Sequence, residues 1–232
     1  MKKNLNQKLI NLIEYYTLLN SNLLLSVNEI KRKSDNSPIS FIGSKSEKLE
    51  KLKKAIGLIK NCDLKKSANN LVFADGDINS KLMIIGEGPG ANEDKEGKPF
   101  VGRAGKLLSK MLEAIQLNRS KVYITNVVNY RPPENRKPTE EEIIRYLPYL
   151  KSHIEIIKPQ ILLLLGSTAL NAIVDDEVVI SKARGKWIQK QINSLNPWII
   201  ASFHPAFLMR QPEQKKLAWI DLKMIREKLK KL

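Results

Sequence analysis

Residues 81–108, KLMIIGEGPGANEDKEGKPFVGRAGKLL, carry the pattern around which the rest of the chain is arranged. The apolar run at 82–85 is short, stops at a glycine and predicts a buried strand. A turn rich in glycine and proline follows it, and Glu87 lies inside this turn. Open α/β sheets bind ligands in loops at the carboxyl ends of their strands. The stretch therefore predicts a strand that leads directly into a binding loop.

The same stretch holds an aromatic residue between two conformational restraints. Phe100 lies between the glycine and proline of residues 97–99 and Gly102, where a helix is expected to begin. A lone phenylalanine is most often part of a hydrophobic core. Among so many glycines and acidic residues, we favour a ring that is presented to a ligand.

The composition points to a polyanionic partner. The chain has 232 residues, of which 42% are apolar, and a formal net charge of +16. Neutralising phosphates releases counterions, which draws such a protein to nucleic acid. A lysine-rich composition spread evenly over the surface is the alternative explanation of the charge.

Cys62 is the one cysteine of the chain. One cysteine builds neither a disulfide framework nor a four-cysteine metal site within a chain. The first residues, Met-Lys-Lys, are not followed by an uninterrupted apolar segment, and no apolar run reaches the length of a membrane span. We therefore expect a cytoplasmic protein with no membrane association.

The apolar residues of the first twenty positions recur at helical spacing and predict an amphipathic helix. A polar segment with a proline and a glycine follows and marks a linker. Residues 46–60 again place apolar side chains on one helical face, with Ser46 as the expected N-cap. We expect residues 1–45 to be a helical extension with its linker, and residues 46–232 to be an α/β domain.

Downstream, apolar runs alternate with helical patterns. Core strands are expected at 82–85, 121–128, 160–165 and 198–203, and an edge strand near 187–191. Helices are expected at 104–115, 140–157, 167–174 and 212–232, and a basic turn at 181–185. Thr139 and Glu142 form a capping box. This alternation predicts a three-layer α/β/α sandwich with a central, mainly parallel four-stranded sheet.

Three polar residues fall at or just after the carboxyl ends of predicted strands: Glu87, Asn126 and His204. Their shared location is stronger evidence for a site than any one of them alone. His153, in contrast, lies within a predicted helix and outside any motif, so we expect it to be structural.

Three motifs stand in a characteristic order. They are GEGPG at 86–90 with GKPFVG at 97–102, ITNVV at 124–128 with RPP and NR at 131–136, and His204-Pro205 followed by Leu208 and Arg210. Together they resemble the uracil-DNA glycosylase superfamily, most closely the family-4 enzymes. The resemblance extends from about residue 57 to the C-terminus and leaves the N-terminal extension outside. It implies an enzyme that flips uracil out of DNA and hydrolyses its N-glycosidic bond, which starts base-excision repair.

Family-4 enzymes normally hold an iron–sulfur cluster through four cysteines. The matching positions here are Cys62, Lys65, Tyr130 and Tyr146. A cluster needs several thiolates, so we expect no cluster and no other metal or cofactor. We expect a tyrosine ring to fill the vacated space.

The resemblance also assigns roles to residues. The uracil-binding set is Gly86, Glu87, Gly88, Phe100, Asn126 and His204, with Glu87 and His204 as the catalytic residues. The best-known uracil glycosylase family has its catalytic aspartate at the position of Gly88, which leaves open which group positions the attacking water. The expected DNA contacts are Arg131, Arg136, Lys182, Arg184, Leu208, Met209 and Arg210.

Two alternatives stay open. One is a relative that recognises or covalently traps uracil in DNA without releasing it; the loop at 129–138 lacks the histidine that the covalent branch carries. The other is a polymerase-associated DNA-binding module with a vestigial pocket. For the enzyme we expect uracil-containing DNA as partner, a monomer, and a repair or replication protein as a further partner of the N-terminal extension.

Overall fold

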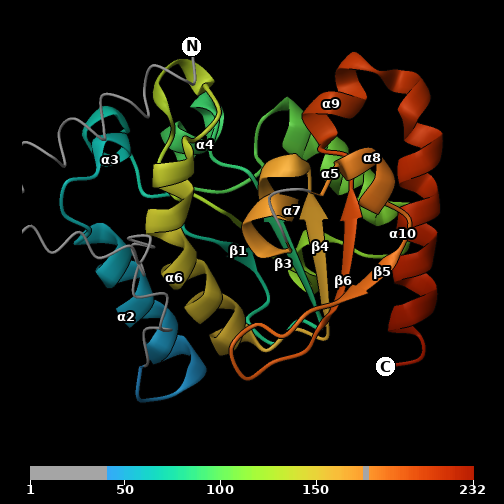
Figure 1. Cartoon of the computed structure of the whole chain (residues 1–232), viewed down its shortest axis with the longest axis horizontal. Helices are drawn as coiled ribbons and strands as arrows, with labels where there is room; N and C mark the ends of the chain where they lie inside the picture. Colours follow the sequence, from blue (N-terminus) through green and yellow to red (C-terminus); the bar gives the residue numbers. More distant parts are fainter. Residues whose placement is uncertain (1–40, 175–177) are drawn as a thin grey trace, which may run out of the picture. The chain divides into compact units, whose positions relative to one another are not determined.

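The computed structural model describes residues 41–174 and 178–232. The expected N-terminal helix and most of the linker lie outside the described residues. At the centre is a sheet of six strands in the order β1-β3-β2-β4-β6-β5 (Figure 1). No helix in this described part is long and apolar enough to cross a membrane.

Four parallel strands form the middle of the sheet, as expected. They are β2 (Leu82–Gly86), β3 (Tyr123–Asn126), β4 (Ile161–Leu165) and β6 (Trp198–Ser202). The prediction of a four-stranded sheet is wrong in number, because an antiparallel strand closes each edge. These edge strands are β1 (Asp75–Gly76) and β5 (Trp187–Gln189). Strand β5 confirms the edge strand expected near 187–191, whereas β1, with two residues, is too short to show the alternation by which a strand is recognised.

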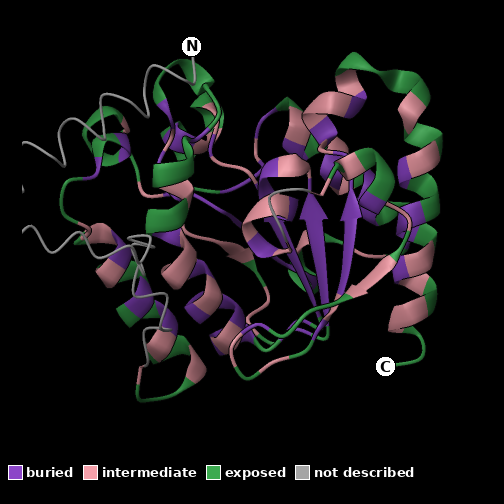
Figure 2. Cartoon of the chain, in the orientation of Figure 1, coloured by how far each residue is buried: buried purple, intermediate pink, exposed green. Residues whose placement is uncertain are grey.

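Helices cover both faces of the sheet, because successive side chains of a strand point to opposite faces. In β2, Met83 and Ile85 join one core cluster, whereas Leu82 and Ile84 join the other. The first cluster is completed by α2 (Lys45–Gly57), α6 (Glu140–Ile157) and α7 (Ser167–Ile173). The second is completed by α5 (Arg103–Glu113), α9 (Pro205–Arg210) and α10 (Lys215–Leu229). Apart from half-buried Trp198 at the start of β6, every residue of the four central strands is buried (Figure 2).

Helix starts follow the capping rules. Thr139 and Glu142 form the expected capping box at the start of α6. Helix α2, in contrast, is capped by Ser44, which forms a capping box with Glu47. The prediction of Ser46 as the cap is wrong, because the side chain of Glu47 reaches back three residues to the backbone N–H of Ser44.

Several short helices were not expected. They are α3 (Asp63–Ser67), α4 (Ala91–Glu96) within the acidic part of the opening stretch, and α8 (Ile180–Ala183) in place of the basic turn. Single 3-10 turns add η1 (Arg119–Lys121), η2 (Pro133–Asn135) and η3 (Pro212–Gln214). Each spans fewer than two turns, so no helical period appears in its sequence.

The order of the sheet decides where a ligand fits. From β2 the chain adds β3 on one side and then crosses to add β4 on the other side. The connections therefore diverge at the carboxyl end of β2, and a crevice opens there between neighbouring loops. Glu87, Asn126 and His204 all lie at this edge.

Candidate active site

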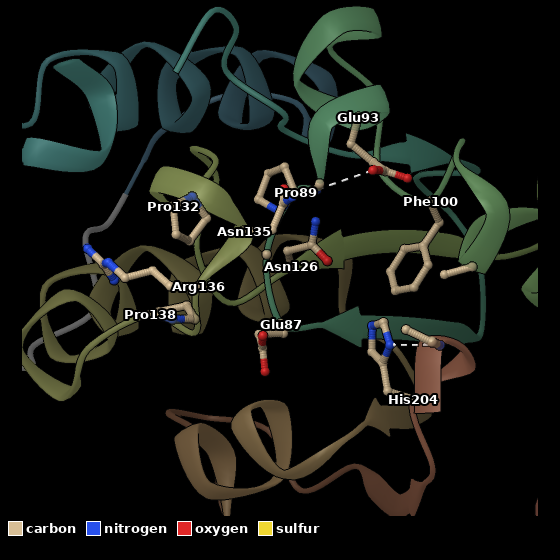
Figure 3. Close-up of a pocket in the computed structure, with 14 residues that line it drawn as sticks. Glu87, Pro89, Glu93, Phe100, Asn126, Pro132, Asn135, Arg136, Pro138 and His204 are labelled. Atoms are coloured by element: carbon tan, nitrogen blue, oxygen red, sulfur yellow. Dashed lines mark hydrogen bonds between the residues drawn. The ribbon is translucent and has the colours of Figure 1, made fainter. Parts of the chain in front are cut away.

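A cavity of about 220 Å³ lies at this edge of the sheet (Figure 3). Among its lining residues are Glu87, Gly88, Phe100, Asn126 and His204, so segments far apart in the sequence meet here. A groove of about 510 Å³ continues from it and shares Glu87 and His204 with it. The arrangement provides a compact pocket with an extended channel beside it.

Asn126 is the last residue of β3 and forms the polar wall of the pocket. It pairs in the sheet with Gly86, and its side chain is only 3% exposed. Its Oδ1 atom is buried without a hydrogen-bond partner. A buried unpaired acceptor costs about 1–3 kcal/mol. The amide is therefore held ready for a ligand that presents an N–H or O–H donor.

Gly86 leaves the space that Asn126 and Phe100 occupy. A β-carbon at this position would lie 2.5 Å from Cζ of Phe100 and would also overlap Oδ1 of Asn126. No side chain fits there unless the pocket moves. Gly86 thus allows the aromatic ring and the amide to meet over the end of β2.

Phe100 takes part in both the core and the pocket. Its side chain is 6% exposed and packs in the second core cluster, while its ring also lines the cavity. The ring centroid lies 5.6 Å from that of His204. Phe100 is therefore a core residue whose ring is also available to contact a ligand.

His204 caps helix α9 with its own ring. Nδ1 accepts a hydrogen bond from the backbone N–H of Ala206 at 3.2 Å (Figure 3). Burial lowers the pKa of the imidazole, an effect that the nearby charge of Glu87 opposes. In a neutral ring whose Nδ1 accepts, the proton sits on Nε2. His204 is thereby prepared as a neutral hydrogen-bond donor.

Two carboxylates line the cavity, and their surroundings differ. Glu87 accepts a hydrogen bond from the hydroxyl of Thr168, in the first turn of α7. Glu93 accepts hydrogen bonds from three backbone amides, those of Gly90, Val101 and Gly102, at 2.7–3.2 Å. Both oxygens of Glu93 are therefore used to hold the loop, whereas the Thr168 hydroxyl engages a single oxygen of Glu87.

Gly88 contributes backbone only. A β-carbon there would lie 2.8 Å from Cγ2 of Val128, so the wall behind it is closed. Neither Glu93 nor Thr168 was expected at the site from the sequence. Glu93 accepts a hydrogen bond from the backbone N–H of the N-cap Gly90, and a glutamate three residues after an N-cap is the one signal in the sequence that points to this contact. Thr168 carries no such signal.

Of the expected DNA-contacting cations, Arg136 lines the cavity and Arg210 lines the groove. Arg136 also forms an ion pair with Glu142 at 2.6 Å. Arg131 donates to Asn135 at 2.8 Å, and Lys182 is exposed on α8. These residues lie on chain segments that border the cavity or the groove.

Arg184 does not face outward as expected. Its guanidinium forms an ion pair with fully buried Asp221 and donates to the carbonyl of Leu217. It also lies over the ring of Phe203, 5.7 Å from its centroid. A buried charge needs a partner of this kind, so Arg184 joins α8 to α10 and we do not include it in a DNA-binding surface.

Leu208 is likewise turned inward. Its side chain is 1% exposed in the core beneath α9, so it does not present to DNA the contact that was expected of it. Met209 is half-buried. Phe207, which was not expected, is also half-buried and lines the groove. Because α9 is short, which of its residues face outward depends on what it packs against.

The four positions expected to correspond to the family's cluster ligands, Cys62, Lys65, Tyr130 and Tyr146, carry a single thiol between them. Cys62 lies 3.2 Å from the hydroxyl of Tyr146, and both pack with Tyr130 in the first core cluster. Burial raises the pKa of the Tyr146 hydroxyl, so it stays protonated. Lys65 points to the carbonyl of Gly57. Among residues 41–174 and 178–232, no three His, Cys, Asp or Glu side chains gather as a metal site.

Comparison with known proteins agrees with this geometry. The model of the uracil DNA glycosylase superfamily matches residues 73–223. The type-4 uracil-DNA glycosylase of Sulfurisphaera tokodaii is 41% identical over 189 residues, which cover 78% of this chain and 84% of the relative. That of Thermotoga maritima is 39% identical over 176 residues, covering 73% and 88%. A DNA polymerase of Bacillus phage SP01 is 31% identical over 151 residues, but only 16% of its length is matched. The chain therefore belongs to the uracil-DNA glycosylase superfamily.

Proposed function

We infer that this protein is a uracil-DNA glycosylase of DNA repair, a hydrolase that removes uracil from DNA. The observation that carries the inference is the buried, unpaired Oδ1 of Asn126, a residue that lines a cavity together with Phe100 and His204. Relatives that are about 40% identical over most of the chain are type-4 uracil-DNA glycosylases. A base inside a duplex is out of reach, so the enzyme takes the nucleotide out of the stack into this pocket.

Asn126 distinguishes uracil from cytosine. Its Oδ1 accepts the N3–H of uracil and its amide donates to O4. Cytosine presents an acceptor at N3 and a donor at N4, so both contacts fail. Each buried group left unpaired costs about 1–3 kcal/mol. The unpaired Oδ1 in the free protein supports this assignment.

His204 and Glu87 act on the bond itself. When the N-glycosidic bond breaks, its electron pair moves to uracil and the sugar becomes positively charged. The Nε2–H of His204 donates to uracil O2, and a donor aimed at charge that develops in the transition state is worth about 2.7–4 kcal/mol. Glu87 stabilises the cationic sugar or orients the attacking water, as carboxylates do in glycoside hydrolysis. Support for Glu87 over Glu93 comes from the three amides that already occupy Glu93.

The DNA strand follows the groove beside the pocket. Arg131, Arg136, Lys182 and Arg210 are the proposed phosphate contacts, because phosphate contacts position a protein on DNA. Half-buried Met209, which was expected together with Leu208 as a DNA contact, is the proposed apolar residue beside the flipped nucleotide.

We also propose that the protein works without an iron–sulfur cluster. The Cys62–Tyr146 contact and the ring of Tyr130 fill the region where four thiolates would be needed. Protein purified under anaerobic conditions should contain no stoichiometric iron or acid-labile sulfide and should still release uracil. Stoichiometric iron, or activity that depends on added iron and sulfide, would contradict this proposal.

The activity is tested with an oligonucleotide that contains one uracil. Metal-free wild-type protein should release free uracil, and Asn126→Ala and His204→Ala should each abolish the release. The two variants also expose any contaminating host enzyme, because such activity would persist in all preparations. Uracil-selective binding without release would favour the non-catalytic alternative.

A further inference from the structure

Phe100 adopts a backbone conformation that a bulky residue rarely takes. Its φ is 54°, in the left-handed region, although it is not a glycine. Such a conformation is unfavourable for a residue with a side chain and persists only where the surroundings hold it. The strained residue is the one whose ring lines the pocket next to His204.

Arg119 holds the backbone at this point. Its Nη1 donates to the carbonyl of Phe100 and its Nη2 to the carbonyl of Pro99, both at 2.8 Å. On the other edge of the guanidinium, Nε and Nη2 donate to Oδ2 of Asp75 at 3.0 and 2.7 Å. The planar fork of an arginine can bind two successive carbonyls and a carboxylate in this way, whereas the ammonium of a lysine cannot.

The next residues are held from the opposite side. Glu93 accepts from the amides of Val101 and Gly102 at 2.9 and 2.7 Å. The backbone of α5 comes so close that a β-carbon at Gly105 would overlap the carbonyl of Phe100. The carbonyl of Phe100 thus has Arg119 as its side-chain partner, and little space remains for it to turn elsewhere.

Arg119 and Asp75 do not line the cavity or the groove. Any effect of Arg119 on uracil is therefore indirect, and Phe100 is the residue that both accepts a hydrogen bond from Arg119 and lines the cavity. We propose that Arg119, oriented by Asp75, is a positioning residue that holds Phe100 in the left-handed conformation and so places its ring against the extruded base. This inference rests on the proposed function.

The expected signature is weaker binding of the base. Stacking of the ring is present in the substrate and product complexes as well as in the transition state, so its loss raises KM more than it lowers kcat. Without the hydrogen bonds from the Arg119 guanidinium, the backbone of Phe100 relaxes to negative φ and its ring leaves the wall opposite Asn126. We expect Arg119→Lys and Arg119→Ala to raise KM and the inhibition constant of free uracil about tenfold. Asp75→Asn should have a smaller effect in the same direction.

The test is a double-mutant cycle with Phe100→Leu, which keeps an apolar side chain in the core but removes the aromatic ring. If Arg119 acts through Phe100, Arg119→Ala should change KM and uracil inhibition little in the Phe100→Leu background. Arg226→Ala is the matched control, because Arg226 is paired with Glu227 on α10 and lines neither cavity. It should leave both constants unchanged.

The outcomes of these measurements distinguish the positioning role of Arg119 from the proposed glycosylase function. A role in stability alone would lower the melting temperature of Arg119→Ala and leave KM and uracil inhibition of the folded protein unchanged, which would overturn the inference. A full effect of Arg119→Ala in the Phe100→Leu background would also overturn it. If wild type itself releases no uracil, the proposed function fails, and direct binding of free uracil to wild type and Arg119→Lys then decides the positioning role.

Discussion

Replacing Gly86 by alanine adds one methyl group at the point where the pocket is tightest. The new β-carbon would lie 2.5 and 2.6 Å from two ring atoms of Phe100 and would overlap Oδ1 of Asn126. Carbon atoms pack at about 3.5–4.0 Å. The ring, the amide or the strand must therefore move by about 1 Å.

A displacement of this size has a predictable cost in activity. Moving catalytic or binding groups by about 1 Å can lower a rate about 100-fold, which corresponds to about 2.7 kcal/mol of transition-state stabilisation. The φ of Gly86 is not in the left-handed region, so alanine causes no backbone strain there. Any loss then comes from the contact with Phe100 and Asn126.

The assay is kcat/KM for uracil release, measured with thermal unfolding of the same preparations. Extra volume in a packed core also costs about 1–3 kcal/mol of stability, so rates are compared well below the melting temperature. Gly57→Ala is the control, since nothing lies within 4 Å of its β-carbon at the end of α2. It should leave kcat/KM unchanged. Folded Gly86→Ala protein with activity within about twofold of wild type would refute the argument.

Three further predictions concern other groups. Thr168→Val removes the hydroxyl that donates to Glu87 and should lower kcat/KM about tenfold. Thr168→Ser keeps a hydroxyl and should have the kcat/KM of wild type. Equal kcat/KM for Thr168→Val and wild type would exclude this role. Burial lowers the pKa of His153 to about 3, so its neutral form stabilises the fold above pH 6.5 and this contribution is lost as the pH falls. Urea unfolding between pH 7 and 5 should show a loss of up to about 1.4 kcal/mol per pH unit, and a smaller loss in His153→Gln. Arg210→Ala should weaken DNA binding and reduce its dependence on salt by about one unit of slope, and an unchanged slope would remove Arg210 from the phosphate contacts.

The parallel core of the sheet was predictable because its strands are continuous apolar runs, buried on both faces and bounded by glycine or polar residues. Elements too short to show the periodicity of a helix or a strand were not predictable. Helix α4 and the edge strand β1 are too short for any pattern to appear. Their existence depends on neighbours, such as β3 for the pairing of β1 and the loop amides for Glu93.

The meeting of three polar residues at one edge of the sheet was also predictable. Glu87, Asn126 and His204 follow different strands, and parallel strands bring their carboxyl ends to one edge, so their proximity follows from the chain order and sheet type. The orientations of Arg184 and Leu208 did not follow in this way. Arg184 pairs with Asp221, 37 residues further along the chain, and Leu208 turns toward α5 and α10. Such contacts depend on which surfaces meet after folding.

The sequence by itself thus determined the α/β class, the four core strands and the edge of the sheet where the polar residues gather, because local periodicity and chain order carry that information. Only the tertiary structure decided how each side chain is held there. It brings Asp75, Arg119 and Glu93 from separate segments around the backbone next to Phe100. It also leaves Oδ1 of Asn126 without a partner. Hydrogen bonds between distant segments depend on distances of a few tenths of an ångström, which no pattern in the sequence encodes.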